Sequence, residues 1–289
     1  MQIVTHIKNF IYTKYGRIII DFTVITIIAI LIFRNLLFTF EWPGGGDVLG
    51  MISRSYLFGK DFRWLYVWRP HSFGFAEGIY AYDFFLMLIY FVCRDPSFTT
   101  KIFLFSSFLL AGFFMYAFAY RYTRKHIAAL SAALIYILNP WFFSQFTEAH
   151  GDLIFSYALA PLLFLLLDKA LETGKFRDIL ALSLMFAVFV TSFHPESIVI
   201  YGMFLLVFVL IYVLKPTKTN NFRIRIKRLL KISVPIGVIS FLLAAPTILP
   251  LLSNLAPPYY SPTYQYYVCL LYTSPSPRDR TRSRMPSSA

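Results

Sequence analysis

The sequence predicts an all-α protein that crosses a membrane several times. Of its 289 residues, 58% are hydrophobic and 19% aromatic, and the mean hydropathy is +0.63. These values lie above the range of soluble domains. Long apolar runs alternate with short connections that hold most of the charge. Because hydrocarbon admits only backbones that satisfy their own hydrogen bonds, we expect about seven transmembrane helices and one interfacial or re-entrant helix in a long first outer loop.

The first apolar run, "IIIDFTVITIIAILIF" at 18–33, is near the length that a single span needs. No small-residue cleavage site follows it, so we expect an uncleaved anchor rather than a signal peptide. Asp21 lies one turn inside this run, where we expect it to pair with Arg17 at the membrane interface. Further apolar runs occupy residues 79–93, 102–120, 127–143, 154–167, 179–192, 198–214 and 232–252.

Basic residues in the connections predict the orientation of the chain. Connections 121–126 and 168–178 each hold three Lys or Arg, and 215–231 holds seven. Connections 144–153 and 193–197 hold none, so the positive-inside rule assigns them to the outer face of the cytoplasmic membrane and places the N-terminus inside.

The connections can alternate between the inner and outer faces only if one early apolar run does not cross the membrane. Residues 79–93 are the candidate, because this run has 15 residues and is bracketed by Asp83 and Arg94. That length suits a helix that lies at the interface or re-enters.

The formal net charge of +13 does not predict a nucleic-acid partner. The basic residues lie between apolar runs, which favours membrane orientation over nucleic-acid binding. The chain has no nucleic-acid-binding motif, P-loop, GxGxxG or CxxC pattern.

The first outer loop begins "EWPGGGDVLGMISRSYLF", and its glycines free the backbone to turn just before Asp47. This turn would bring the carboxylate close to a substrate. The alternative is that Asp47 caps a short surface helix. The same loop holds Arg54, Lys60, Arg63 and Arg69, which would bind an anionic ligand or lipid headgroups.

Two further polar groups lie in predicted outer connections. Glu148, His150 and Asp152 form an E-x-H-x-D run that would hold a divalent cation or form a solvated turn. His194 and Glu196 flank Pro195 at the tip of a helical hairpin, where polar side chains are functional candidates.

The "GGGD" turn, the join "YRYTRKHIAAL", the end "LNPWF" and the segment "ALAPL" together resemble the GT-C class of integral-membrane glycosyltransferases. The similarity extends over about residues 35–175 and is nearest to the N-terminal membrane region of the arabinofuranosyltransferase D type. The resemblance implies sugar transfer from a polyprenyl-phosphate donor to an acceptor glycan, lipid or protein outside the cytoplasmic membrane. It also implies that Asp47 is the catalytic base or the group that orients the acceptor. Many members carry two adjacent acids there, whereas this chain has Asp47 alone, with Glu41 six residues earlier.

Residues 269–289, "CLLYTSPSPRDRTRSRMPSSA", resemble translated sequencing-adapter DNA. We therefore expect residues 1–268 to be the N-terminal part of a GT-C-like membrane domain and 269–289 to be a non-native, disordered tail. The alternative is a genuine basic tail. Without Cys269, Cys93 remains as the single cysteine, so no internal disulfide is expected.

Two other functions compete with the glycosyltransferase. A transporter or flippase for lipid-linked glycans would carry buried charges in mid-span and paired half-helices. A non-catalytic membrane subunit would tolerate the loss of Asp47.

Overall fold

The structure is a computed structural model that describes residues 13–39, 52, 68–69, 75–76, 81–191, 195–214 and 222–255. The chain divides into two compact units, residues 1–65 with 79–245 and residues 66–78 with 246–289. In the second unit, β1 (Trp68–Arg69) pairs antiparallel with β2 (Phe75–Ala76). The described part of the chain is otherwise almost entirely helical, which confirms the all-α prediction.

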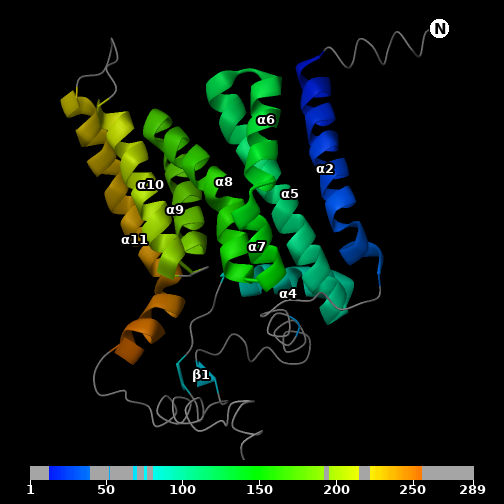
Figure 1. The fold of residues 1–289 in the computed structure, drawn as a ribbon. Helices are drawn as coiled ribbons and strands as arrows, with labels where there is room; N and C mark the ends of the chain where they lie inside the picture. The colour runs from blue at the N-terminus through cyan, green and yellow to red at the C-terminus, as the bar shows by residue number, and fades with distance from the viewer. Residues whose placement is uncertain are drawn as a thin grey trace, which may run out of the picture. The chain divides into compact units, whose positions relative to one another are not determined.

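The helices follow the predicted apolar runs closely (Figure 1). They are α2 (Lys14–Phe38), α4 (Ala81–Cys93), α5 (Pro96–Thr123), α6 (His126–Ile137), α7 (Pro140–Glu148), α8 (Gly151–Thr173), α9 (Phe176–Thr191), α10 (Pro195–Leu214) and α11 (Phe222–Leu255).

Short polar signals set the helix ends. The side chain of Asp95 accepts from the N–H of Phe98 at 2.6 Å and begins α5, with Pro96 in the first turn. Helix α8 ends at Gly174, whose φ of 61° is the left-handed conformation that glycine adopts without strain.

Helix α5 is the centre of the first unit, where it contacts α2, α4, α6 and α8. Gly112 permits this packing, because a Cβ atom there would lie 2.9 Å from Cγ2 of Ile25 on α2. Two hydrophobic clusters meet along α8, one shared with α2, α4, α5, α6 and α7, the other with α9, α10 and α11.

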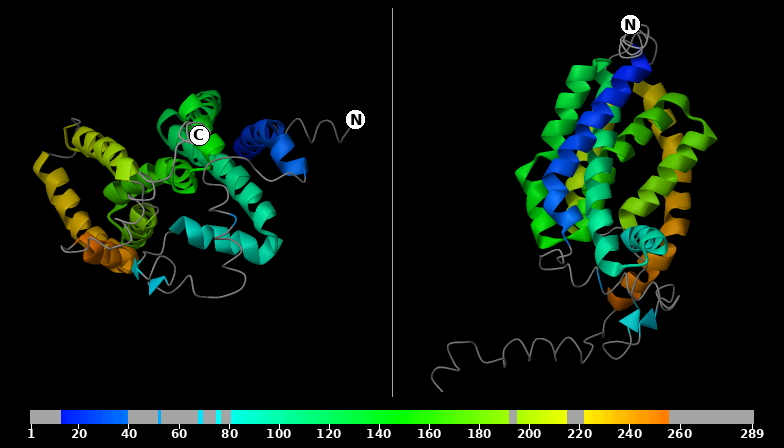
Figure 2. Two further views of the ribbon diagram at one scale, coloured as in Figure 1. Left: turned by 60° about the horizontal axis from the view of Figure 1, so that its bottom comes forward. Right: turned by 90° about the vertical axis from the view of Figure 1, so that its right-hand side faces the viewer.

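Helix α4 differs from its neighbours in length and direction. It has 13 residues, about 20 Å at 1.5 Å per residue, which is shorter than a membrane's hydrocarbon core. Figure 2 shows it lying across the helices of the first unit rather than along them. Its length agrees with the prediction that this run does not cross.

Among the described residues, four helices are long and apolar enough to span a membrane: α2, α5, α8 and α11. A fifth span exists if α6 and α7 are taken together, although the two are bent by 43°. Large apolar side chains are exposed on α2 and α11, including Leu31 (61%) and Val234 (68%), as expected of surfaces that face lipid.

The run 127–143, predicted as one span, is broken in the structure between α6 and α7. The side chain of Asn139 accepts from the N–H of Trp141 at 2.8 Å, and Pro140 occupies the first position of α7. An Asn-Pro pair is a strong helix-start signal, so it begins a new helix inside an uninterrupted apolar stretch.

Candidate functional site

Half of the candidate site residues that the sequence singled out lie outside the described residues. These are Asp47, Arg54, Lys60, Arg63 and His194. The backbone of Arg69 lies in β1, and that of Glu196 in the first turn of α10. The segment 269–289 also lies outside the described part of the chain.

The E-x-H-x-D run forms the junction between α7 and α8. Glu148 is the exposed last residue of α7, and Asp152 lies in the first turn of α8. Nδ1 of His150 lies 2.8 Å from Oε1 of Gln145, and the backbone N–H of His150 donates to the carbonyl of Gln145 at 3.1 Å. The run therefore builds a tight helix connection, and within the described ranges no three His, Cys, Asp or Glu side chains gather as a metal site would need.

The Asp21 carboxylate has different partners from the one predicted. Its Oδ2 atom accepts from the hydroxyl of Tyr116 at 2.6 Å and lies 3.2 Å from Nδ1 of His126. The prediction of an Arg17 pair overlooked these groups because Tyr116 and His126 are about a hundred residues away in sequence. Burial of Asp21 against α5 and α6 brings the three side chains together.

The most distinctive local arrangement is a reciprocal pair of tyrosines. The hydroxyl of Tyr136 donates to the carbonyl of Tyr157 at 2.8 Å, and the hydroxyl of Tyr157 donates to the carbonyl of Tyr136 at 2.9 Å. Their rings stack with centroids 4.1 Å apart.

Two prolines explain this pair. In a helix the carbonyl of residue i accepts from the N–H of residue i+4. The i+4 residues here are Pro140 for Tyr136 and Pro161 for Tyr157, and proline has no N–H. Each tyrosine hydroxyl thus satisfies the carbonyl that a proline leaves without its helical donor.

The sequence carried a signal for this arrangement. The pattern Tyr-x-Leu-x-Pro occurs as "YILNP" at 136–140 and as "YALAP" at 157–161. Sequence reasoning noted "LNPWF" and "ALAPL" as markers of resemblance but not the tyrosine four residues before each proline.

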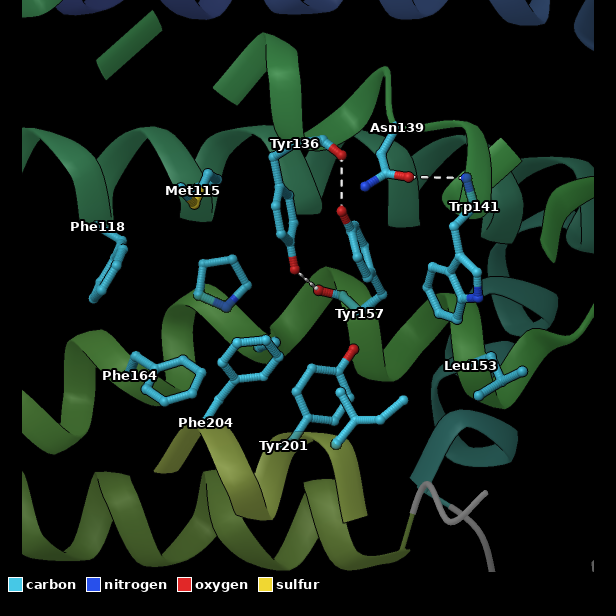
Figure 3. Close-up of a pocket in the computed structure, with 13 residues that line it drawn as sticks. Met115, Phe118, Tyr136, Asn139, Trp141, Leu153, Tyr157, Phe164, Tyr201 and Phe204 are labelled. Carbon is cyan, nitrogen blue, oxygen red and sulfur yellow. Dashed lines mark hydrogen bonds between the residues drawn. The ribbon is translucent and has the colours of Figure 1, made fainter. Parts of the chain in front are cut away.

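The tyrosine pair forms one wall of a cavity of about 550 Å³ between α5, α6, α7, α8 and α10 (Figure 3). The lining is mostly aromatic and aliphatic: Met115, Phe118, Tyr136, Asn139, Trp141, Leu153, Tyr157, Ala160, Pro161, Phe164, Ile200, Tyr201 and Phe204. We call this the aromatic cavity. Its size and lining suit an apolar ligand.

Few polar groups face the aromatic cavity. Both hydroxyls of the Tyr136–Tyr157 pair are engaged with backbone carbonyls. The amide of Asn139 and the hydroxyl of Tyr201 also lie at the wall, where Figure 3 shows the Tyr201 oxygen directed toward Tyr157. A sugar needs many hydrogen-bond partners, so this lining fits a hydrocarbon chain better than a sugar ring.

These features define a multi-pass α-helical membrane protein with an apolar cavity inside its helix bundle. Residues 80–270 match the profile of a family described as "6-pyruvoyl-tetrahydropterin synthase related domain; membrane protein". The match covers well over half of the chain, and the chain belongs to this family. No curated protein and no solved structure matches it significantly.

Proposed function

We propose that this protein is a GT-C-type glycosyltransferase that moves a sugar from a polyprenyl-phosphate donor to an acceptor glycan, lipid or protein. The observation that carries the proposal is the aromatic cavity, whose volume and apolar lining suit the isoprenoid chain of such a donor. The sequence resemblance over about residues 35–175 supports the same function.

The proposal divides the donor between two parts of the chain. Its hydrocarbon chain lies in the aromatic cavity against Phe164, Tyr201 and Phe204. Its phosphate is bound by the basic residues of the first outer loop, which are Arg54, Lys60, Arg63 and Arg69. Guanidinium groups suit this role because they form charge-assisted, often bidentate hydrogen bonds with phosphate oxygens.

The proposed reaction needs one base and one stabilised leaving group. A hydroxyl of the acceptor attacks the anomeric carbon of the sugar and gives its proton to the Asp47 carboxylate. The bond from the anomeric carbon to the phosphate oxygen breaks, and polyprenyl phosphate leaves as an anion. A positioned carboxylate contributes roughly 10²–10⁴-fold to such a step.

The proposed topology has seven crossings of the cytoplasmic membrane, with α9 and α10 among them and the N-terminus inside. In this arrangement the end of α6 and the start of α8 face the outer side. The aromatic cavity then extends inward from the outer ends of α6 and α8, and its outer end lies on the same side of the membrane as Asp47.

The test is sugar transfer from a radiolabelled polyprenyl-phosphate donor by the full chain in proteoliposomes. Asp47→Asn should lower transfer about 10²-fold or more while leaving donor binding intact. Glu41→Gln is the matched control, because it removes the other acid of the same region and should retain transfer. Undiminished transfer by Asp47→Asn would exclude Asp47 as the base.

One observation favours a second function, the translocation of lipid-linked glycans. Helices α6 and α7 are bent by 43° at a short break, and broken helices are a hallmark of transporters. Proteoliposomes separate the two functions. A translocator moves the intact lipid-linked sugar between leaflets without acceptor, whereas a transferase releases polyprenyl phosphate only when acceptor is present.

A further inference from the structure

A second cavity, of about 490 Å³, lies where α5, α8 and α10 end and α11 begins. Its lining contains four arginines and two acids, which gives it a formal charge of +2: Arg121, Arg124, Arg225, Arg228, Asp168 and Glu172. We call this the arginine cavity. It shares no lining residue with the aromatic cavity.

Arg121 forms ion pairs with both acids of the lining. Nε of Arg121 contacts Oδ2 of Asp168, and its Nη2 donates to Oε2 of Glu172 at 2.5 Å. The positive excess of the lining therefore belongs to Arg124, Arg225 and Arg228.

Two of these three arginines bind helix ends. Nη1 of Arg225 donates to the carbonyl of Tyr212 at 2.9 Å, in the last turn of α10. Nη1 of Arg228 donates to the carbonyls of Leu171 and Glu172 at 3.3 and 3.2 Å, at the end of α8. Cations at helix C-termini are favourable, but carbonyl oxygens are neutral and do not cancel the guanidinium charge.

The side chain of Arg124 makes no such hydrogen bond to a helix end. It is the exposed C-cap of α5, and within the described residues its side chain has no hydrogen bond or ion pair. Its guanidinium is thus available to a ligand of this cavity, whose lining carries a formal charge of +2.

An apolar stripe leads from the arginine cavity along α10. Ile211 lines the cavity and is 59% exposed, and Val207, Leu210 and Leu214 are exposed on the same helix face at spacings of three, four and seven residues. Phe208 adds an aromatic ring to the cavity wall. An anion bound here would have hydrocarbon surface directly beside it.

We propose that the arginine cavity binds the phosphate headgroup of an anionic membrane phospholipid, with an acyl chain along the exposed face of α10. Arginine suits phosphate because its planar donors match the oxygens bidentately. The adjoining stripe favours a lipid phosphate over a soluble one. Basic recesses between membrane helices bind acidic lipid headgroups by this combination of charge and apolar surface.

The test uses the full chain purified in a neutral detergent and titrated separately with phosphatidylglycerol, phosphatidylcholine and inorganic phosphate. Thermal unfolding reports apparent affinity, since a ligand that binds the folded state raises the unfolding temperature. Phosphatidylglycerol should stabilise the protein at concentrations where phosphatidylcholine and inorganic phosphate have no effect. Equal stabilisation by inorganic phosphate would identify a soluble phosphate ligand, and equal stabilisation by phosphatidylcholine would exclude headgroup recognition. Either result overturns the proposal.

The variant Arg124→Gln should weaken the apparent affinity for phosphatidylglycerol about tenfold, as expected for the loss of a charge-assisted contact. Arg124→Lys keeps the charge and should recover part of that loss. Lys175→Gln is the matched control, because it removes one exposed positive charge from the α8–α9 connection outside the cavity lining. Equal weakening by Arg124→Gln and Lys175→Gln would show that general charge attraction, not this cavity, binds the lipid.

Discussion

The aromatic cavity and the arginine cavity are lined by the same three helices, α5, α8 and α10, yet they have opposite chemistry. On α5 the lining changes from Phe118 to Arg121 within one turn, and on α8 it changes from Phe164 to Asp168. The aromatic cavity lies within the length of these helices, whereas the arginine cavity lies where all three end. On these three helices, position along the helix therefore decides the character of the lining, and α11 adds Arg225 and Arg228 to the arginine cavity alone.

Beside both cavities, side chains donate hydrogen bonds to backbone carbonyls that lack a helical donor. Beside the aromatic cavity, Pro140 and Pro161 free two carbonyls, and the neutral hydroxyls of Tyr136 and Tyr157 satisfy them. At the arginine cavity, helix ends free the carbonyls, and guanidinium groups satisfy them. A neutral donor keeps the first cavity apolar, while a charged donor leaves the second able to attract an anion.

The largest expected effect is on the tyrosine pair. Tyr136→Phe should destabilise the protein by about 1–3 kcal/mol, because the carbonyl of Tyr157 loses its donor in an apolar setting. Adding Pro161→Ala should restore much of this loss, since an alanine at 161 supplies the helical N–H.

The matched control is Tyr157→Phe with Pro161→Ala. In that variant the unmet carbonyl belongs to Tyr136, which Pro140 deprives of its donor, so no rescue is expected. Thermal unfolding in detergent compares the two single variants, Tyr136→Phe and Tyr157→Phe, with the two double variants that add Pro161→Ala. Equal rescue in both backgrounds would refute the assignment of each hydroxyl to one proline.

A slightly smaller effect is expected at the arginine cavity. Arg225 is 6% exposed, and Arg225→Met removes the donor to the last turn of α10. We expect a loss of about 1–2 kcal/mol in thermal unfolding experiments. Arg225→Lys should lose less, because an ammonium can still reach one carbonyl. An unchanged stability of Arg225→Met would mean that water replaces the guanidinium at this helix end.

Narrowing the aromatic cavity from its edge should weaken the binding of a polyprenyl chain. Ile200 lines the cavity and is 46% exposed, so Ile200→Trp should fill part of it without disturbing the buried core. The apparent affinity for a photoreactive polyprenyl phosphate, measured by crosslinking, should fall about tenfold. Val199→Trp is the control, because Val199 is 63% exposed and does not line the cavity. An equal loss in the control would mean that the lipid binds the outer face of α10.

The smallest effect concerns pH. Asp178 accepts from the hydroxyl of Thr173 at 2.7 Å and forms an ion pair with Nζ of Lys169 at 3.2 Å, and these contacts hold the pKa of its carboxyl below the usual range. The folded state therefore prefers the ionised carboxylate. Its stabilising contribution is present above the unfolded-state pKa of about 4 and is lost as pH falls through the lower folded-state pKa.

Asp178→Asn should accordingly reduce stability near neutral pH and flatten the acid side of the unfolding curve. Thermal unfolding of both forms over a pH series measures this difference. Parallel curves for the two forms would show that other carboxylates govern the acid response.

Hydropathy located the helices because each buried or lipid-facing segment must be apolar along its whole length. The short α4 also followed from sequence, since the apolar run 79–93 has only 15 residues and contains Asp83, which makes it too short to span a membrane. Hydropathy did not predict the break between α6 and α7, because Asn139 and Pro140 interrupt the helix without lowering the apolar character of the run. The count of seven crossings and the role of Asp47 stay predictions.

The amino-acid sequence was enough to predict a helical membrane protein, because composition and the length of apolar runs decide how a chain partitions between water and lipid. It also contained both Tyr-x-Leu-x-Pro segments. The packing of the helices brings these two segments into mutual hydrogen bonds and places Asp21 beside Tyr116 and His126. It also gathers four arginines from α5 and α11 around one cavity. Such contacts join residues distant in sequence, and they depend on how helices pack rather than on any local pattern.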